Sequence, residues 1–285
     1  MVSRLELYKE CLEILERSEI ADSEFDVLCI FQDMLGEKNP IFKPNENVPE
    51  EAETKIRSLV KKLTDGEPLQ YLLGEWEFWG YPFKVGKGVL IPRPDTETLV
   101  EEVLRICRGY GLDSLKIADL CSGSGCIAVA LKKELPDAEV CAMELSEDAL
   151  YYLQENVKRN NVDVRVIFAD VLDPKSAELL NESDIIVSNP PYLTAEDMSD
   201  LQTEVAKEPS MALFGGEDGL DFYRKMTRLW KNSLKTGGFL CYEFGMGQHE
   251  SVGMLLKANG FTDIEFAKDA GGIIRTVTAR KTEEC

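Results

Sequence analysis

Apolar, strand-like segments alternate with helical patterns from about residue 95 onward, and this alternation is the strongest constraint on the fold. Parallel strands are joined by crossovers of a dozen or more residues, usually helices, so the pattern predicts a parallel sheet wrapped by helices. Only a short AGG loop separates the last two apolar segments, so we expect them to form an antiparallel hairpin at the sheet edge. The expected parallel strands span 115–121, 138–144, 164–170, 183–188 and 238–244, and the hairpin strands span 262–268 and 273–280.

The N-terminal segment has a purely helical pattern. Ser3 followed by Glu6 is a capping-box signal, and apolar residues then recur at helical spacing. A second periodic stretch begins at Ser23, and a third begins at Pro49 and ends before Gly66. These signals predict a small helical domain over residues 1–65.

A segment of different composition joins the two patterns. Residues 67–92 combine aromatic and β-branched residues with Gly and Pro, which indicates a hairpin or a pair of short strands. Asp95 is the expected N-cap of a helix that continues to about Cys107. We therefore expect a helical domain at 1–65, a β-hairpin connector at 66–94 and an α/β domain at 95–285.

Acidic residues dominate the composition, with 52 Asp and Glu against 32 Lys and Arg and a formal net charge of −20. Nucleic-acid affinity rests largely on Lys and Arg that displace counterions, so direct nucleic-acid binding is not expected. The eight cysteines contain no CxxC pair, which indicates reduced thiols. Charges interrupt the N-terminal segment and no apolar run has membrane-spanning length, so we expect a cytoplasmic protein without a membrane partner.

A turn of small residues follows the first expected parallel strand, between Asp119 and the helix expected at Ile127–Leu135. Gly123 and Gly125 allow a left-handed backbone or a close approach by a ligand, and the helix N-terminus presents free N–H groups to a carboxylate such as that of adenosylmethionine. Any tight strand-to-helix turn can need glycine, so this signal alone is weak.

The next two strands also end in acidic residues. Glu144 ends the second strand, where a carboxylate can accept hydrogen bonds from both ribose hydroxyls of an adenosine. The alternative for Glu144 is a helix-capping acid. Asp170 ends the third strand, where it can accept from an adenine amino group while Val171 packs against the ring. Three successive strand ends thus suit one adenosine ligand.

The fourth strand runs directly into Asn189-Pro190-Pro191-Tyr192, the most specific motif in the chain. A planar nitrogen conjugated with a carbonyl or a ring is a poor nucleophile, and fixed acceptors for its N–H groups improve it. The Asn189 side-chain oxygen and the Pro190 carbonyl can be those acceptors, and Tyr192 can stack on the flat amide or base, so that alignment supplies most of the rate. The alternative is a proline-stiffened loop with a capping Asn.

Other chemistries have little support. The only histidine is His249, on an expected helix, which excludes His-based triads and clustered-His metal sites. We expect no metal and a surface position for His249.

Taken together, these residues resemble class I adenosylmethionine methyltransferases with an Asn-Pro-Pro-Tyr motif, and among them the release-factor glutamine methyltransferase family (PrmC/HemK). The resemblance covers nearly the whole chain. Beyond the tetrad it includes Gly66-Glu-Pro-Leu-Gln-Tyr71, Glu77-Phe-Trp-Gly80, Leu90-Ile-Pro-Arg-Pro94 with Glu97, and the stretch from Gly215 to Arg224.

The resemblance implies a Rossmann-like, seven-stranded class I methyltransferase domain with an antiparallel C-terminal hairpin, preceded by a helical bundle and a β-hairpin. It implies transfer of a methyl group from S-adenosylmethionine to the glutamine of the Gly-Gly-Gln tripeptide in peptide-chain release factors. The helical domain would recognise the release factor, and we expect a monomer.

The site residues carry over by position. Asn189 to Tyr192 would receive the glutamine amide, with Asn189, Pro190 and Tyr192 catalytic and Asn189 also facing the cofactor. Asp170 is added from its chemistry alone. The residues implied at the cofactor are Cys121, Ser122, Gly123, Ser124, Gly125, Glu144 and Val171.

One position, Cys121, departs from the family pattern, and another, Arg93, has two alternative roles. Cys121 stands where the turn often has glycine, a change that would be harmful if this position needed φ > 0, although Gly123 and Gly125 remain. Arg93 either lies near the cofactor or forms a structural ion pair.

Three alternative functions fit parts of the pattern. N6-adenine methylation of nucleic acid makes the same demands on the tetrad, because a flipped base also presents a planar amine. The charge of −20 argues against it. Ribosomal-protein glutamine methylation shares the tetrad and fold, and a non-catalytic adenosylmethionine-binding adaptor is a fourth hypothesis.

Overall fold

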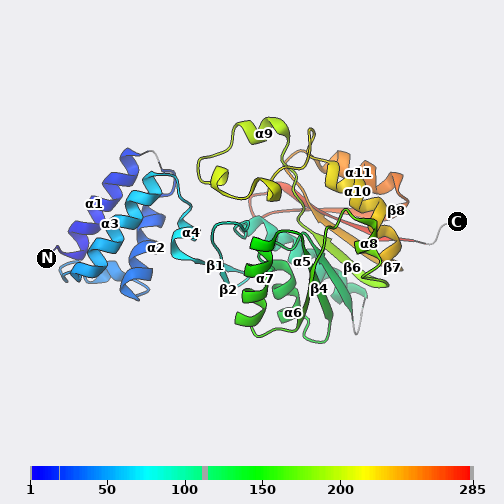
Figure 1. The fold of residues 1–285 in the computed structure, drawn as a ribbon, viewed down its shortest axis with the longest axis horizontal. Helices are drawn as coiled ribbons and strands as arrows, with labels where there is room; N and C mark the ends of the chain where they lie inside the picture. Colours follow the sequence, from blue (N-terminus) through cyan, green and yellow to red (C-terminus); the bar gives the residue numbers. More distant parts are fainter. Residues whose placement is uncertain (1, 19, 111–114, 283–285) are drawn as a thin grey trace. The chain divides into compact units, whose positions relative to one another are not determined.

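The structure, a computed structural model, describes residues 2–18, 20–110 and 115–282. It divides into two compact units, coloured along the chain in Figure 1. One unit contains the residues up to Glu75 together with Gln202–Lys207, and the other contains Trp76–Leu201 and the residues from Glu208 onward.

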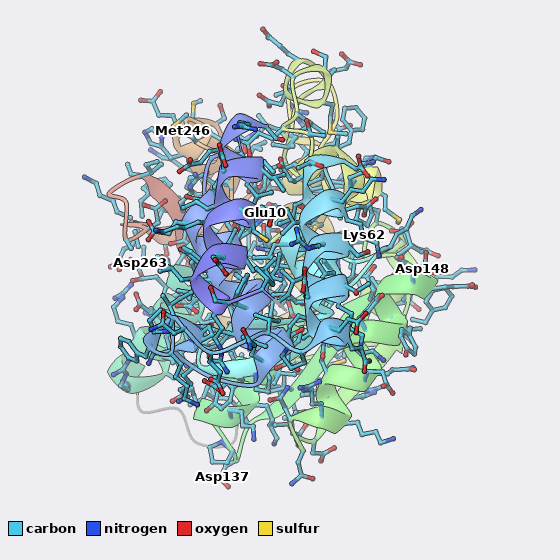
Figure 2. The ribbon with its side chains drawn as sticks, turned by 90° about the vertical axis from the view of Figure 1, so that its left-hand side faces the viewer. Glu10, Lys62, Asp137, Asp148, Met246 and Asp263 are labelled. Carbon is cyan, nitrogen blue, oxygen red and sulfur yellow. The ribbon has the colours of Figure 1, made fainter. Side chains whose placement is uncertain are left out.

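The first unit is built on helices that pack around an apolar core. The Ser3 hydroxyl accepts from Glu6 N while the Glu6 carboxylate accepts from Ser3 N, so the expected capping box is confirmed. Glu10 on α1, labelled in Figure 2, forms an ion pair with Arg57 on α3. The helices are α1 (Arg4–Arg17), α2 (Ser23–Leu35), η1 (Pro40–Phe42), α3 (Glu50–Thr64) and α4 (Leu69–Leu73), and their buried residues include Leu7, Leu15, Ile30, Phe31 and Ile56.

A small two-stranded sheet of β1 (Glu75–Phe78) and β2 (Tyr81–Lys84) follows. Trp79 and Gly80 both have positive φ, as a two-residue hairpin turn requires. Asn156 fixes the second strand, because its side chain accepts from Lys84 N at 2.6 Å and donates to Lys84 O at 3.0 Å. The expected hairpin is therefore present.

The second unit contains a seven-stranded sheet with the order β5-β4-β3-β6-β7-β9-β8. The strands from β3 to β7 pair in parallel, and β9 pairs antiparallel with both β7 and β8, which confirms the expected fold class and terminal hairpin. The strands are β3 (Lys116–Leu120), β4 (Glu139–Glu144), β5 (Val164–Phe168), β6 (Ser183–Ser188), β7 (Leu234–Glu243), β8 (Phe261–Lys268) and β9 (Ile274–Lys281).

Helices cover both faces of this sheet (Figure 1). One face packs against α5 (Glu97–Tyr110), α6 (Cys126–Glu134) and α7 (Glu147–Arg159), and the other packs against α8 (Pro174–Ala177), α10 (Asp221–Trp230) and α11 (His249–Ala258). The connecting segments contain η2 (Pro94–Thr96), α9 (Ala195–Ser199), η3 (Val205–Lys207), η4 (Ser210–Ala212) and η5 (Lys231–Ser233).

Strand residues alternate between the two apolar cores. Ile117 lies in the core under α5 and α6, whereas Ala118 and Leu120 lie in the core under α10 and α11. In a parallel sheet, ligands bind beyond the carboxyl ends of the strands where the strand order reverses, and β3 is that point here.

Two local expectations need correction. Asp95 is not an N-cap: Arg93 holds that position, because Pro94 begins a 3-10 turn that leads into α5. The third parallel strand ends at Phe168, so Asp170 lies in the loop beyond it. In the part of the chain that the structure describes, no helix has the length and apolar character needed to cross a membrane.

Candidate active site

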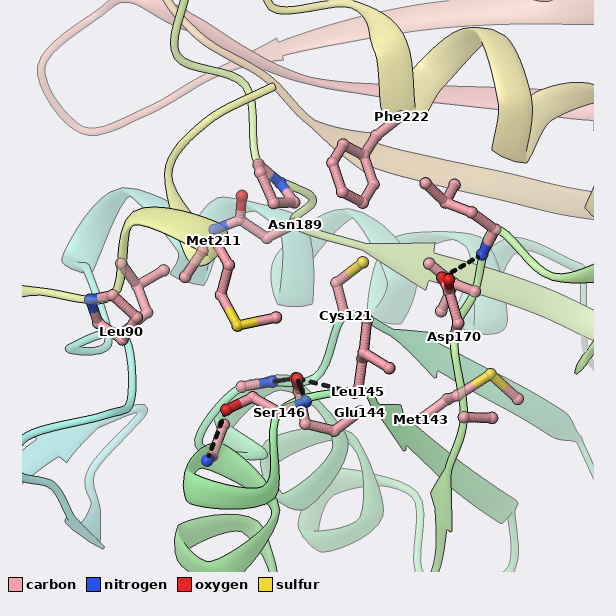
Figure 3. A pocket seen from close by; sticks show the side chains of 18 of the residues that line it. Leu90, Cys121, Met143, Glu144, Leu145, Ser146, Asp170, Asn189, Met211 and Phe222 are labelled. Atoms are coloured by element: carbon pink, nitrogen blue, oxygen red, sulfur yellow. Dashed lines mark hydrogen bonds between the residues drawn. The ribbon is translucent and has the colours of Figure 1, made fainter. Parts of the chain in front are cut away.

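A cavity that is partly open to solvent lies beyond the carboxyl ends of the central parallel strands (Figure 3). Cys121, Glu144, Asp170 and Asn189 reach it from four successive strand ends. Apolar side chains, including Phe222, complete the lining. Residues far apart in the sequence are thus brought together at one place.

The turn after β3 supplies one wall. Cys121 and Gly123 line the cavity, and both have left-handed backbones, with φ of 59° and 54°. Nothing lies within 4 Å of a Cβ added to Gly123, so its left-handed φ alone favours glycine there. Cys121 therefore has the positive φ that is unfavourable for a residue other than glycine. This left-handed backbone costs about 1–2 kcal/mol of conformational free energy.

The other turn residues lie away from the cavity lining and hold the turn together. The Ser122 hydroxyl donates to Asp119 O at 2.8 Å, and Ser124 O accepts from the Asn156 amide at 2.9 Å. A Cβ on Gly125 would lie 2.3 Å from Leu153 Cδ1, so this glycine also allows close packing against α7.

Glu144 is held in place by backbone donors. Its Oε2 accepts from Gly123 N at 2.8 Å, and its Oε1 accepts from Leu145 N at 2.9 Å and Ser146 N at 2.8 Å. The hydroxyl of Ser146, the N-cap of α7, accepts from Ala149 N. A carboxylate has about four acceptor sites, so Glu144 keeps capacity for a ligand hydroxyl.

Asp170 and Val171 follow β5 at the next strand end. Asp170 Oδ1 accepts from Leu172 N at 2.8 Å, which fixes the carboxylate beside the cavity (Figure 3). Val171 also lines the cavity and is nearly fully buried. Its carbonyl accepts from Trp230 Nε1 at 2.8 Å, which ties this loop to α10.

A third acid, Asp119, is fully buried beneath the turn. Neither of its carboxylate oxygens has a hydrogen-bond partner among the described residues. Burial raises the pKa of Asp119 to about 8. Its place near the end of β3 is visible in the sequence, but its burial without a partner depends on how α6 covers the sheet.

The tetrad follows β6 without a break. Asn189 and Pro191 line the cavity, whereas Pro190 and Tyr192 are not among its lining residues. The Asn189 Nδ2 group donates to the Thr96 hydroxyl at 3.2 Å. Burial raises the pKa of Tyr192, so its phenol stays protonated.

Distant residues brace the end of the tetrad. Gln248 Nε2 donates to Tyr192 O at 2.9 Å, and Gln248 Oε1 accepts from Gly245 N at 2.9 Å. A Cβ on Gly215 would lie 2.7 Å from both Pro191 O and Tyr192 Cα, so only glycine lets this loop approach the tetrad so closely. Neither Gln248 nor Thr96 could be predicted from the sequence, because no local pattern links them to the tetrad.

Arg93 forms an ion pair with the buried Glu208, whose other oxygen accepts from Ile91 N at 2.9 Å. It is not among the residues that line the cavity, which favours the structural role. His249 begins α11, half-buried, with its ring edge-on to Phe266 at 6.0 Å. The described residues contain no cluster of three His, Cys, Asp or Glu side chains that could hold a metal ion.

The strand order, the terminal antiparallel hairpin and the cavity at the strand ends define a class I methyltransferase fold. A family model described as methyltransferase small domain matches residues 96–216. The solved structure of the T. thermophilus 16S rRNA N2 G1207 methyltransferase, in complex with AdoMet and guanosine, has a TM-score of 0.52 at 18% identity. The similarity covers 73% of this chain and 49% of that one, and it shows the fold alone.

Closer relatives identify the family. The release factor glutamine methyltransferase of Thermodesulfovibrio yellowstonii is 38% identical, over 87% of this chain and 88% of its own length. That of Geobacter sulfurreducens is 43% identical, over 79% of this chain and 77% of its own length. The model of the PrmC N-terminal domain matches residues 6–74. The chain belongs to the release factor glutamine methyltransferase family.

Proposed function

We propose that this enzyme transfers the methyl group of S-adenosylmethionine to the side-chain amide nitrogen of the glutamine in the Gly-Gly-Gln motif of release factors. One observation carries the proposal: Asn189, with its amide held by Thr96, lines the same cavity as Glu144 and Asp170. Groups suited to an adenosine and a group suited to an amide acceptor therefore share one space.

The cavity suits adenosylmethionine in its donor set. Glu144 would accept from a ribose hydroxyl, Asp170 from the adenine amino group, and Val171 would pack on the ring. The negative charge of these acids favours a cationic ligand. When bound, this cofactor supplies a methyl group on a positively charged sulfur.

The tetrad prepares the acceptor nitrogen. Asn189 Oδ1 and Pro190 O would accept its two N–H groups, which draws the amide away from planarity and aims its lone pair into the cavity. Tyr192 would stack on the flat amide. A protonated Tyr192 is no general base, so orientation is the main contribution of the protein.

The acceptor is a protein rather than a nucleic acid on electrostatic grounds. A net charge of −20 repels phosphates and complements a basic protein that binds ribosomal RNA. We assign release-factor recognition to the helical domain at 1–65 and keep 66–94 as connector and 95–285 as the catalytic domain. We also expect a cytoplasmic monomer.

Incubation with labelled adenosylmethionine and a panel of acceptors tests the function. The panel contains a release factor, its Gln→Ala variant at Gly-Gly-Gln, a ribosomal protein and DNA. Label on the intact factor alone is the expected result. Label on DNA or the ribosomal protein, or equal label on the Gln→Ala factor, would falsify the proposal.

A further inference from the structure

A buried polar cluster lies around the Asn189 side chain. Thr96, the last residue of η2, and Glu243, the last residue of β7, are each 2% exposed. Neither is among the residues that line the cavity, whereas Asn189 is. The cluster therefore reaches the cavity lining through Asn189.

These three side chains lie side by side, because Ser188 pairs with Tyr242 across β6 and β7. Asn189 Nδ2 donates to the Thr96 hydroxyl at 3.2 Å, and the Thr96 and Asn189 side chains both favour the charged form of the Glu243 carboxyl. The second oxygen of Glu243 has no partner among the described residues. Thr276, which pairs with Glu243 across the β7–β9 ladder, is fully buried and its hydroxyl is likewise unpartnered within that part of the chain.

The carboxylate decides which way the Asn189 amide faces. A threonine hydroxyl can donate or accept, so Thr96 alone accommodates either orientation of the amide. An ionised Glu243 only accepts. It therefore takes the Thr96 O–H, leaves the Thr96 lone pairs for Asn189 Nδ2, and excludes an orientation that turns Oδ1 inward.

We propose that Thr96 and Glu243 are positioning residues that hold the Asn189 amide with Nδ2 turned inward, so that Oδ1 stays available to the acceptor nitrogen. This inference rests on the proposed function. A flipped Asn189 would present its N–H groups to the N–H groups of the glutamine amide, and donor would face donor. We call the series Glu243, Thr96 and Asn189 the relay. It therefore acts on the rate of methyl transfer rather than on the affinity for the cofactor.

The groups that face Glu243 make the relay sensitive to pH. Burial raises the pKa of Glu243 to about 7, Arg275 on β9 opposes this, and Asp95 on η2 adds to it. Tyr192 from the tetrad, Tyr223 on α10 and Cys126 on α6 also face Glu243, and burial raises the pKa of each, so they stay neutral. Below about pH 7, protonated Glu243 can donate to Thr96 and the orientation of Asn189 is no longer fixed.

Three variants test the relay in the full-length enzyme with a release factor as acceptor. Thr96→Val removes the hydroxyl at constant shape, Thr96→Ser retains it, and Glu243→Gln replaces the acceptor by a group that can also donate. We expect kcat to fall roughly 10- to 100-fold in Thr96→Val and Glu243→Gln, as misplaced reacting groups imply. Thr96→Ser should stay within about threefold of wild type, and the Kd of adenosylmethionine within about twofold in all three.

The pH profile gives the second readout. Wild-type kcat should rise through about pH 7 as Glu243 ionises, and this limb should be absent in Glu243→Gln. A kcat within twofold of wild type in Thr96→Val, or equal losses in Thr96→Val and Thr96→Ser, would overturn the inference. If wild-type enzyme methylates no release factor, the proposed function fails first, and the relay fails with it.

Discussion

The site has a cofactor half, with Glu144 and Asp170, and an acceptor half, the tetrad Asn189 to Tyr192. Different kinds of contact hold the two halves in place. In the cofactor half, the two acids that line the cavity are held by backbone N–H groups: Glu144 by Leu145 N, Ser146 N and Gly123 N, and Asp170 by Leu172 N. In the acceptor half, the tetrad is held by side chains from far along the chain. Thr96 is 93 positions from Asn189, and Gln248 is 56 positions from Tyr192.

This difference separates two tasks. Local backbone donors fix carboxylates wherever a strand meets a helix, which suffices to hold a ligand. An amide oxygen aimed at a reacting nitrogen needs constraints from several directions, and only tertiary structure supplies them. The cofactor half should therefore govern affinity, and the acceptor half should govern rate.

The largest expected effect is that of Asn189→Ala. Loss of the acceptor oxygen should lower kcat by about 100-fold or more, similar to the loss of one aligned hydrogen-bonding group in other active sites. Cofactor affinity by calorimetry should change only a few-fold. Asn181→Ala, at an exposed asparagine, is the matched control. If Asn189→Ala lowered the affinity for adenosylmethionine as much as it lowers kcat, the two halves would not have separate roles.

Glu144→Ala should show the reverse pattern. Removal of this carboxylate eliminates the proposed ribose acceptor and leaves backbone donors unpaired, so the Kd of adenosylmethionine should rise roughly 10- to 100-fold. Glu147→Ala removes an exposed acid in the first turn of α7 and should bind normally. An unchanged Kd in Glu144→Ala would instead support the helix-capping role.

Gly215→Ala tests the acceptor half at a residue that lies outside the tetrad. The added Cβ would lie 2.7 Å from Pro191 O and Tyr192 Cα, so the tetrad must shift. We expect kcat to fall about 10-fold with little change in cofactor Kd, because a small misplacement weakens alignment. Gly109→Ala, where the added Cβ meets nothing within 4 Å, should leave kcat unchanged. Equal activities of the two variants would show that the glycine loop does not position the tetrad.

The same contrast explains what the sequence could predict. The strand–helix alternation, the capping box at Ser3 and the terminal hairpin depend on local periodicity, and each is present in the structure. The convergence of Glu144, Asp170 and Asn189 on one cavity follows from parallel topology, which places all strand ends at one edge.

What could not be predicted depends on long-range packing. Thr96, Glu243 and Gln248 are ordinary polar residues in the sequence, and only folding brings them to the tetrad. The family resemblance raised a left-handed backbone at Cys121 only as a possibility, because cysteine itself has no preference for that conformation. Asp95 was misplaced as a cap, since the 3-10 turn begins at Pro94.

A separate prediction concerns stability rather than activity, through Asp119 beneath the turn after β3. Burial raises its pKa from 3.8 to about 8, so the folded state holds this proton more tightly than the unfolded state. The free energy of unfolding of the wild type should therefore fall as pH rises from about 4 to 8. That of Asp119→Asn should not, because asparagine does not ionise. In thermal unfolding, the Tm of Asp119→Asn relative to wild type should increase from pH 5 to pH 9. A constant difference would mean that Asp119 is not buried as a neutral acid.

The most direct test of the division between the halves is the single-turnover rate of methyl transfer at saturating adenosylmethionine and release factor. Glu144→Ala should recover to within about fivefold of wild type once the cofactor is saturating, whereas Asn189→Ala should remain about 100-fold slower or more. Equal deficits in the two variants, or full recovery of Asn189→Ala, would contradict the account.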